Sequence, residues 1–521
     1  MKKLFTLMAA AVMAMAANAK DYEAEMTVVM GGNPLDTLST TISVTEQGDN
    51  KYTLALNNFV LAEQLYVGNI VLSNVEGTTA SNGRTRLSTN QTITITAGDD
   101  NTKYWYGPHL GSVPVSVNAD MTDTNLYAVI KIESFGGIDV VFGDGNYQIK
   151  NSRFENFHTA TAGSATSDEP DAWHSFMSST GGFASFVNQT PKTFISNDVR
   201  SEATDTCCVL IKSSVVDLGL WKIAANGTIT TGQMQAGAMD AADPANCAFL
   251  NIENTAVDGN GDPFYTLLNG TPDSLTVWVK FKQGQDLGDN KYATVSAAIT
   301  DGTRYQDPED PSVTYNNVVA KAQNAQIESK NYTWQRLSIP FDYDTYASNN
   351  AETKALLVTI STNAQPGAGS TDAANPDSLL VDDIALVYNA GLESLTVKGS
   401  EVTLEEGTTS YTVSGLSGEL TLDDIVAVSD GQGAYVTKAI ETTDDGATVT
   451  ITVTSNDYQT VNTWTINVPG VSTGIEKVET TTENGVQAIY TLDGRKVGSM
   501  NSKGVYIVRK ADGTTVKVLK K

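Results

Sequence analysis

Apolar residues at alternate positions, in short runs bounded by turn-forming residues, are the feature that most constrains the fold of this chain. Residues 274–281 show the pattern clearly. The side chains predicted to face the core are Leu275, Val277, Val279 and Phe281. Those predicted to face the other way are Thr276, Trp278 and Lys280. A period of two is that of a β-strand with one buried face, and turn signals recur roughly every 8–12 residues. The predicted fold class is therefore all-β, built from barrels and sandwiches.

The length of 521 residues corresponds to roughly three or four domains of ~100–200 residues each. Residues 1–19 predict a cleaved secretory signal peptide, because Lys2-Lys3 precedes a short apolar run and Ala17-Asn18-Ala19 supplies the small residues of a cleavage site. That run is too short to span a bilayer, and no later segment approaches the ~18 apolar residues that a span needs. We therefore expect a secreted or cell-surface protein that is not transmembrane, with the periplasm as an alternative.

Net charge and cysteine content limit the partners and the bonds that the chain can form. A net charge of −27 excludes a protein that tracks nucleic acid, which needs basic stripes to neutralise phosphate. The three cysteines are an odd number: Cys207, Cys208 and Cys247. Adjacent residues on a strand point to opposite faces, so either one of the adjacent pair bonds to Cys247 or all three stay unpaired.

Histidine ligands for zinc show no recognisable spacing along the chain. The three histidines, His109, His158 and His174, are not placed as zinc ligands usually are, so no zinc site is expected. Residues 258–262 begin like an EF-hand loop, but Pro263 stands where that loop needs glycine. We interpret this segment as a turn.

Residues 20–148 form the first predicted domain. Strand-like segments occur in the order 22–24, 52–59, 67–72 and 140–143. This order resembles the calycin-like β-barrel domains of secreted Bacteroidetes proteins. The resemblance implies a lipocalin-like barrel of eight strands, whose interior either holds one small ligand or is filled by side chains.

Residues 149–389 form the second predicted domain. Four segments mark it in order: Phe154-Glu155-Asn156, Tyr305-Gln306-Asp307-Pro308, 334–343 and Val381-Asp382-Asp383-Ile384. As a set they resemble the provisionally named carbohydrate-metabolism domain of Bacteroidetes surface proteins and, more distantly, the carbohydrate-binding jelly rolls. The resemblance implies a jelly-roll β-sandwich that handles glycans, with the segments at 154 and 381 as its first and last strands, side by side.

The same resemblance implies a structural calcium site. In sugar-binding jelly rolls, a glutamate on the first strand and an aspartate on the last commonly share Ca²⁺, which takes six to eight oxygen ligands. These positions fall on Glu155 and on Asp382 or Asp383. Alternation leaves open which aspartate faces inward. It is also open whether one caps a turn while the other is solvated.

Sugar binding needs an exposed aromatic ring beside polar side chains, because a pyranose presents CH groups on its face and hydroxyls at its edge. Trp278 is the best candidate, since it lies on the polar face of its strand, and Tyr305 and Asp307 could line the same groove. The alternative for each is ordinary packing. No carboxylate pair stands out as a glycosidase pair, and no nucleophile, zinc-protease or phosphate-loop motif occurs.

The remaining residues predict two smaller β-domains. Residues 390–470 read as an immunoglobulin-like or cadherin-like sandwich, which usually serves as a spacer. Residues 471–521 predict a small β-domain, and from residue 474 onwards the net charge reverses to +4. A Tyr490-x-Leu492-x-Gly494-Arg495 turn and a strand from Lys503 resemble the C-terminal sorting domain of type IX secretion. The resemblance implies recognition by export machinery.

The first functional hypothesis is therefore an exported, non-catalytic protein that binds carbohydrate. A glycoside hydrolase-like enzyme acting through residues 149–389 is the second. A structural or adhesion protein without a sugar site is the third.

Overall fold

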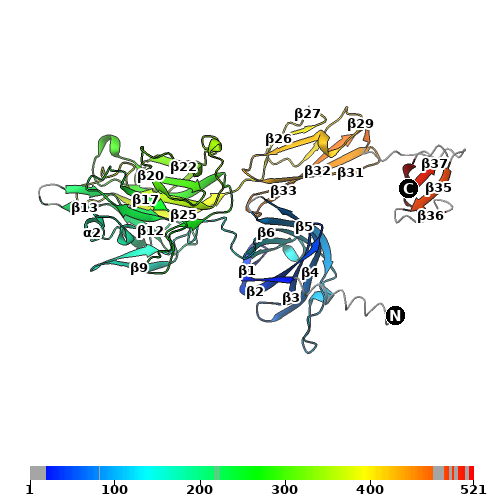
Figure 1. The fold of residues 1–521 in the computed structure, drawn as a ribbon, viewed down its shortest axis with the longest axis horizontal. Helices are drawn as coiled ribbons and strands as arrows, with labels where there is room; N and C mark the ends of the chain where they lie inside the picture. Colours follow the sequence, from blue (N-terminus) through cyan, green and yellow to red (C-terminus); the bar gives the residue numbers. More distant parts are fainter. Residues whose placement is uncertain are drawn as a thin grey trace. The chain divides into compact units, whose positions relative to one another are not determined.

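The computed structural model describes residues 19–80, 83–217, 219, 222–472, 486–491, 496–497, 503–510 and 515–520. Strands dominate throughout, so the predicted all-β class is confirmed (Figure 1). The chain forms two compact units, Met1–Val387 with Asp457–Gln459 and Tyr388–Asn456 with Thr460–Lys521. Residues 1–18 of the predicted signal peptide and 492–495 of the predicted sorting turn lie outside the described residues.

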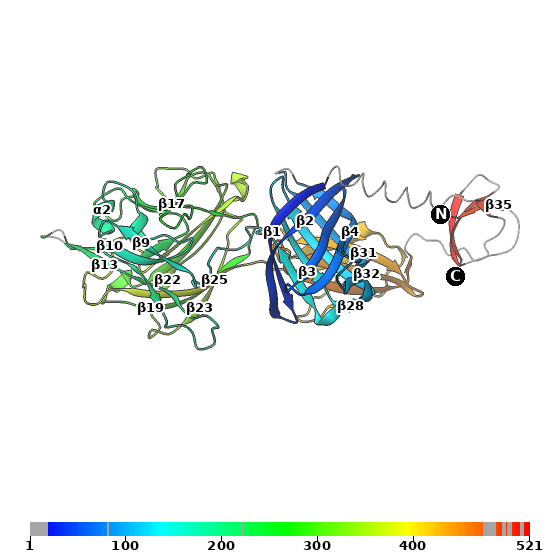
Figure 2. The same ribbon diagram turned by 90° about the horizontal axis from the view of Figure 1, so that it is seen from below.

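The predicted first domain is a closed barrel of eight antiparallel strands (Figure 2). Its strands are β1 (Ala19–Met30), β2 (Asn33–Gly48), β3 (Lys51–Leu61), β4 (Leu65–Thr79), β5 (Thr85–Thr94), β6 (Ser112–Met121), β7 (Leu126–Ile132) and β8 (Ile138–Phe142). Each strand pairs with the next, and β8 closes the ring by pairing antiparallel with β1, so that Met26 lies opposite Phe142. Closure leaves no exposed sheet edge.

Alternation along each strand fills the inside of the barrel. On β1, Tyr22, Met26 and Val28 are buried while Glu23 and Glu25 are exposed. Inward side chains from all eight strands pack into one apolar cluster. Of the two alternatives for the barrel, the described residues therefore favour an interior filled by side chains.

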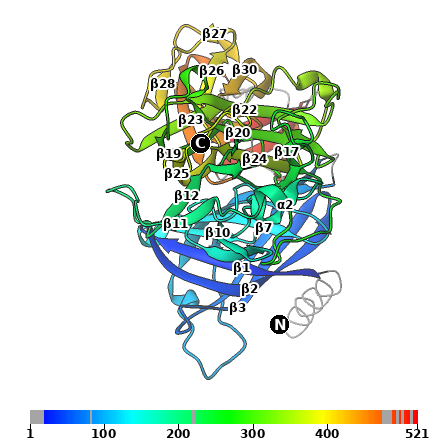
Figure 3. The same ribbon diagram turned by 90° about the vertical axis from the view of Figure 1, so that its left-hand side faces the viewer.

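The second domain is a β-sandwich (Figure 3). One sheet has the order β11 (Thr193–Ser196), β12 (Cys208–Lys212), β25 (Ser378–Val387), β19 (Ser274–Lys282) and β23 (Gln335–Pro340). The other has the order β15 (Thr228–Thr230), β24 (Ala355–Ser361), β20 (Ala293–Thr300) and β22 (Val318–Ile327), with β18 (Thr266–Leu267) also paired to β24. The predicted inward face of β19 is confirmed, because all four of its apolar residues are at most 1% exposed.

The expectation that the segment at Phe154 is a strand beside the last strand is wrong. Phe154 has a left-handed φ of 52° and its N–H donates to the Asn151 carbonyl, so the segment is a turn. The first strand, β9 (Phe157–Ala162), pairs with β10 (Ala165–Pro170), and β25 lies between β12 and β19. The turn nevertheless lies against β25, since the N–H of Ile384 donates to the Ser152 carbonyl at 2.9 Å.

Smaller elements cover the second sheet of the sandwich. They are the sheet of β16 (Gln233–Ala236), β17 (Asn246–Leu250) and β21 (Tyr305–Asp307), the hairpin of β13 (Ser214–Asp217) and β14 (Lys222–Ala225), helix α2 (Ala184–Val187) and the turn η4 (Phe176–Ser178). The cysteines on or beside β12 and β17 are all buried and unpaired, so of the two alternatives the one without a disulfide holds.

The second unit is also built of sheets. A sheet of β27 (Ser400–Glu401), β26 (Leu392–Val397) and β30 (Ile425–Ser429) shares one core with a sheet of β28 (Ser410–Thr412), β33 (Val461–Pro469), β32 (Gly446–Thr454) and β31 (Tyr435–Thr442). The short strands β29 (Gly418–Glu419) and β34 (Val471–Ser472) pair with each other. The C-terminal sheet has the order β36 (Lys496–Val497), β35 (Val486–Thr491), β37 (Gly504–Lys510) and β38 (Thr515–Lys520).

The helical elements are short. The remaining 3-10 turns are η2 (Gly107–His109), η3 (Ser134–Gly136), η5 (Gly288–Asn290), η6 (Ala347–Asn349) and η7 (Leu422–Asp424). Among the described residues, no helix has the length and apolar character that a membrane crossing requires.

Candidate functional site

A cavity of about 470 Å³ lies on the outer face of the β15-β24-β20-β22 sheet. Successive residues of a strand point to opposite faces. On β20, Val295 and Ala297 are therefore buried in the sandwich core, while Thr294 and Ser296 line the cavity. The volume falls within the ~300–1,000 Å³ of small-molecule sites.

Hydroxyl groups form the floor of the cavity, and strand register brings them together. Thr228, Ser361 and Thr294 lie side by side on three adjacent strands. In the next row, Thr359 lies opposite Ser296. All five side chains line the cavity, and we call them the hydroxyl floor. Three strands in one register thus present a row of polar atoms at the spacing of the sheet.

The walls are largely apolar and come from the elements that cover the sheet. The large side chains among them are Phe176, Phe183, Phe186, Met234 and Met239. The Phe183 and Phe186 rings lie 6.0 Å apart between centroids, and Phe186 is 52% exposed. An exposed aromatic ring at the rim of a polar floor is a suitable surface for the CH face of a sugar.

Several polar atoms of the cavity have no hydrogen-bond partner. They are the Oγ1 atoms of Thr294 and Thr359 and the Oδ1 atom of Asn226. Thr359 is only 8% exposed, so its hydroxyl is both buried and unsatisfied. A buried hydroxyl without a partner typically costs about 1–3 kcal/mol. These atoms are free to bond to a ligand that enters the cavity.

Asp307, a predicted sugar-binding residue, lies in this cavity. It is the one carboxylate among the described residues that line the space, and its Oδ2 accepts a hydrogen bond from Ser296 Oγ. Tyr305, two positions earlier on β21, is 1% exposed and packs in an apolar cluster with Leu250 and Val318. Its hydroxyl donates to Glu309, and burial raises its pKa well above the usual value. The structure therefore places Asp307 at the site and Tyr305 in the core.

Trp278 lies on the other sheet and does not share a groove with Asp307. Its cross-strand neighbour on β25 is Asp382, and the Arg200 guanidinium lies over its ring, 4.7 Å from the centroid. A cation stacked on a ring is held there by the ring's negative face. One face of the Trp278 ring is therefore covered by Arg200.

Asp382 and Asp383 meet Asp205 in an acidic cluster that two arginines enter. The three carboxylates offer oxygens within 4.8 Å of one another. Arg200 pairs with Asp383 and lies 3.6 Å from Asp382, while Arg153 pairs with Asp205. Burial, followed by the neighbouring charges of Asp383 and Asp205, raises the pKa of Asp382 to about 7.

A β-bulge in β25 decides which face of the sheet Asp382 takes. The register between β19 and β25 shifts between Thr276 and Trp278, and Asp383 has a left-handed φ of 44°. Asp382 is paired with Trp278 and so lies on the same face of the sheet, where it is fully buried, whereas the Asp383 side chain is 32% exposed. Simple alternation could not show this, because a bulge adds one residue to one strand.

Glu155 lies near this cluster without being one of its three carboxylates. Its carboxylate accepts hydrogen bonds from the Thr206 N–H at 2.8 Å, the Thr206 hydroxyl and the Cys207 N–H. These bonds, led by the Thr206 hydroxyl, lower the pKa of Glu155. Calcium binding by Glu155, Asp382 and Asp383 stays a prediction.

The hydroxyl floor was not among the predicted site residues. The sequence contains a signal for it, since Thr294-x-Ser296 and Thr359-x-Ser361 place two hydroxyl residues on one face of each strand. What the sequence does not contain is the register that makes these strands neighbours. That register depends on pairing between segments about 60 residues apart.

Comparison with known proteins identifies the first domain. Residues 19–143 match the family model of the calycin-like beta-barrel domain. The predicted resemblance of the first domain is thereby confirmed. No curated protein matches the chain.

Solved structures give weak similarities. A Bacteroides fragilis protein provisionally described as an outer membrane protein aligns with 67% of this chain and 98% of its own, at 9% identity and a TM-score of 0.17. Two structures of PNGF-II align with 70% and 72% of this chain and with 67% and 70% of their own. Their identities are 8% and 9%, with TM-scores of 0.13 and 0.11. Similarities at this level carry no information about function.

Proposed function

We propose that this protein binds carbohydrate without chemically changing it, and that the cavity above the hydroxyl floor is the sugar site. The observation that carries the proposal is the pairing of unsatisfied hydroxyl and amide oxygens with an exposed aromatic wall in one cavity. A sugar ring presents hydroxyl groups at its edge and CH groups on its face. The polar atoms of the cavity match the hydroxyl groups, and the aromatic wall matches the CH face.

The number of carboxylates favours binding over hydrolysis. Glycosidases generally use two carboxyl groups, about 5–9.5 Å apart, as acid and as nucleophile or base. Among the described lining residues only Asp307 has a carboxylate, and Ser296 holds one of its oxygens. A hydrogen-bonded single carboxylate suits the recognition of a sugar hydroxyl.

We also propose that the protein is exported from the cell. The predicted signal peptide and the resemblance of residues 471–521 to a sorting domain support a secreted or cell-surface location. The barrel and the second unit would then carry the sandwich as a binding module, and export machinery would recognise the basic C-terminal end.

The test is glycan binding by the whole mature chain from Lys20 onwards. A glycan array identifies the ligand. Titration calorimetry then measures the affinity of the Phe186→Ala and Thr359→Val variants for that ligand. We expect each substitution to weaken binding at least fivefold. Phe135→Ala is the matched control, since Phe135 is also an exposed phenylalanine (46%) but belongs to the barrel.

Three results would contradict the proposal. One is the absence of any glycan ligand on the array. Another is unchanged affinity in both cavity variants, which would move the ligand elsewhere. Release of shortened products from a polysaccharide that the array identifies would replace binding with hydrolysis.

A further inference from the structure

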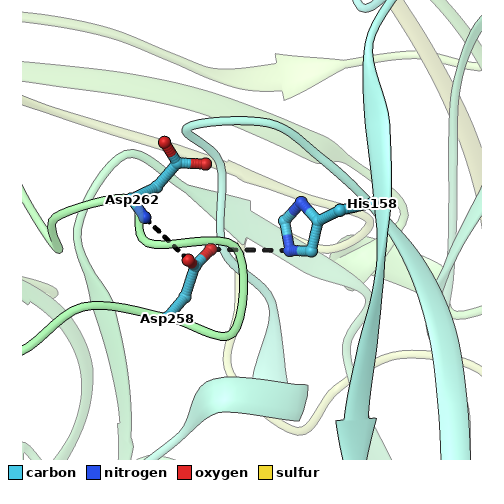
Figure 4. Close-up of side chains that lie close together, drawn as sticks. All are labelled: His158, Asp258 and Asp262. Atoms are coloured by element: carbon cyan, nitrogen blue, oxygen red, sulfur yellow. Dashed lines mark hydrogen bonds and ion pairs between the residues drawn. The ribbon is translucent and has the colours of Figure 1, made fainter.

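Two histidines and two acidic residues meet at one buried point beside the β9–β10 hairpin. His158 on β9 lies directly across from Glu169 on β10. His174 follows β10, and Asp258 comes from a turn in a separate loop (Figure 4). The side chains of Glu169 and His174 are fully buried, that of Asp258 is 2% exposed and that of His158 is 11% exposed. Neither the barrel nor the cavity above the hydroxyl floor contains any of these four side chains.

Each of the four side chains has one polar atom engaged and one buried atom without a hydrogen bond. Glu169 Oε1 accepts from the Ser175 N–H, and Asp258 Oδ1 accepts from the N–H groups of Asn260 and Asp262. The buried atoms without a hydrogen bond are Glu169 Oε2, Asp258 Oδ2, His158 Nε2 and His174 Nδ1. Ligand atoms of Glu169, His174 and Asp258 lie within 4.8 Å of one another, and those of His158, Asp258 and Asp262 form a second such group, so Asp258 is common to both.

The outer bonds of the two imidazoles fix which ring nitrogen carries the hydrogen. His158 Nδ1 lies 3.0 Å from an Asp171 carboxylate oxygen, and His174 Nε2 lies 3.2 Å from the Pro263 carbonyl oxygen. Both oxygens only accept, so these nitrogens donate. The inward nitrogens of neutral rings then carry lone pairs. Metal-bound histidines are commonly held in this way, with the outer nitrogen bonded to a carboxylate or carbonyl.

The separations fit metal ligands better than hydrogen bonds. His158 Nε2 lies 3.4 Å from Asp258 Oδ2 and 3.7 Å from Glu169 Oε2, and His174 Nδ1 lies 3.5 Å from Asp258 Oδ2. An N–H···O bond is about 2.7–3.2 Å long. Ligands about 2.0–2.2 Å from a tetrahedral ion lie roughly 3.3–3.6 Å from one another. Lone pairs at these distances repel unless a cation lies between them.

We propose that Asp258 binds a zinc ion as the ligand common to these two groups, with Glu169 and His174 on one side and His158 on the other. Imidazole nitrogens and carboxylate oxygens are ligands for a first-row divalent ion, and a buried set of such ligands is typical of structural zinc. The ion fastens the β9–β10 hairpin and the segment after it to the loop of Asp258. That loop carries the residues that resemble the start of an EF-hand, but its ligand partners are histidines from elsewhere.

No pattern in the sequence indicates this site, because its ligands are not spaced as a motif. His158 and Glu169 are brought together by hairpin register, which pairs residues eleven apart. Asp258 joins them from about 90 residues further along the chain. The expectation that zinc is absent rested on linear spacing alone.

The first test is the metal content of the tag-free mature protein after dialysis against zinc and then against metal-free buffer. Elemental analysis is expected to give one zinc per chain. His158→Gln and His174→Gln are each expected to lower the content at least tenfold. His109→Gln is the matched control, because the chain's third histidine lies on the barrel, stacked on Tyr104.

A second measurement keeps the proposal testable if a variant does not fold. The chelated wild-type protein is titrated with Co²⁺, and the expected visible absorption is that of a four-coordinate nitrogen and oxygen site, displaced by one equivalent of Zn²⁺. The Asp205–Asp382–Asp383 cluster has no nitrogen ligand and cannot give this spectrum. At a hundredfold excess over the dissociation constant, zinc should raise the melting temperature of its unit by about 5–10 °C.

Two outcomes would overturn the proposal. One is a wild-type protein that neither retains zinc nor gives the cobalt spectrum, which would leave protonated histidines paired with the two carboxylates. The other is equal zinc content in the wild type and both histidine variants, which would place the metal elsewhere.

Discussion

At the scale of single residues, the buried hydroxyl of Thr359 connects stability with the proposed sugar binding. It is 8% exposed and has no hydrogen-bond partner, so the folded protein loses its hydration without a compensating bond. Thr359→Val keeps the shape and removes the unsatisfied atom. We expect the free energy of unfolding to rise by about 1 kcal/mol, measured by urea denaturation, while glycan affinity falls.

Thr230 provides the matched control on the neighbouring strand. It is also fully buried, but its hydroxyl donates to the Val358 carbonyl and accepts from the Gly232 N–H. Thr230→Val should therefore lower the free energy of unfolding by about 1–3 kcal/mol, because it leaves the Gly232 N–H without that partner. Equal effects of the two substitutions would show that the Thr359 hydroxyl is satisfied in solution.

Asp382 makes the sandwich sensitive to pH. Its pKa of about 7 lies above the ~3.9 of an unfolded aspartate, so the folded state holds this proton more tightly. Its contribution to stability is therefore fully present below about pH 4 and declines as the pH rises to about 7. Asp382→Asn should make melting temperature less dependent on pH across this window and raise it at pH 8.

The control for this substitution is Asp289→Asn, at an exposed position in η5. It should leave the difference in melting temperature between pH 4.5 and pH 8 as in the wild type. If Asp382→Asn behaves like this control, the Asp382 carboxylate is ionised in the folded protein throughout the window.

At the scale of elements, the bulge in β25 sets the position of the acidic cluster. Asp383 holds a φ of 44° there, a conformation that asparagine tolerates and β-branched residues do not. Asp383→Asn and Asp383→Val both remove the charge. The difference in stability between the two variants therefore measures the cost of the backbone conformation alone. We expect the valine variant to be less stable than the asparagine variant by about 1–2 kcal/mol in chemical denaturation. Equal stabilities would mean that the bulge relaxes at little cost.

Strands with one buried face could be predicted from the sequence, and irregular segments could not. The alternation at 274–281 indicated β19 and its inward residues correctly, because a single strand already contains that information. The turn at Phe154 and the bulge at Asp383 depend on left-handed residues that are not glycine, which no pattern of polarity reveals.

The candidate sites depend on register between distant segments. Asp307 was predicted and lies in the cavity, but Thr359 and Ser296 become its neighbours only through pairing of β20 with β24 and through the Ser296–Asp307 bond. Trp278 was chosen correctly as a residue on the polar face of its strand. Arg200, which covers one face of the Trp278 ring, comes from a loop whose path cannot be predicted from the sequence.

At the scale of the whole molecule, two compact units predict more than one unfolding transition. Differential scanning calorimetry should resolve at least two, and a zinc chelator should lower only the transition of the unit that holds His158. Ile451→Ala assigns the other transition, because Ile451 is fully buried in the core of the second unit and its truncation should cost about 2–5 kcal/mol there. A single transition that both treatments shift together would mean that the units unfold cooperatively.

The near-neutral lining of the cavity contrasts with a chain that carries a net charge of −27. Uncharged hydroxyls and aromatic rings would hold the proposed ligand through short-range contacts that added salt hardly screens, whereas the long-range field of the surface acts on any charged ligand. Affinity for a neutral oligosaccharide should therefore be almost independent of ionic strength. An oligosaccharide that contains uronic acid should bind weakly in dilute buffer, and its affinity should rise as salt is added. The acidic surface would then select against anionic glycans.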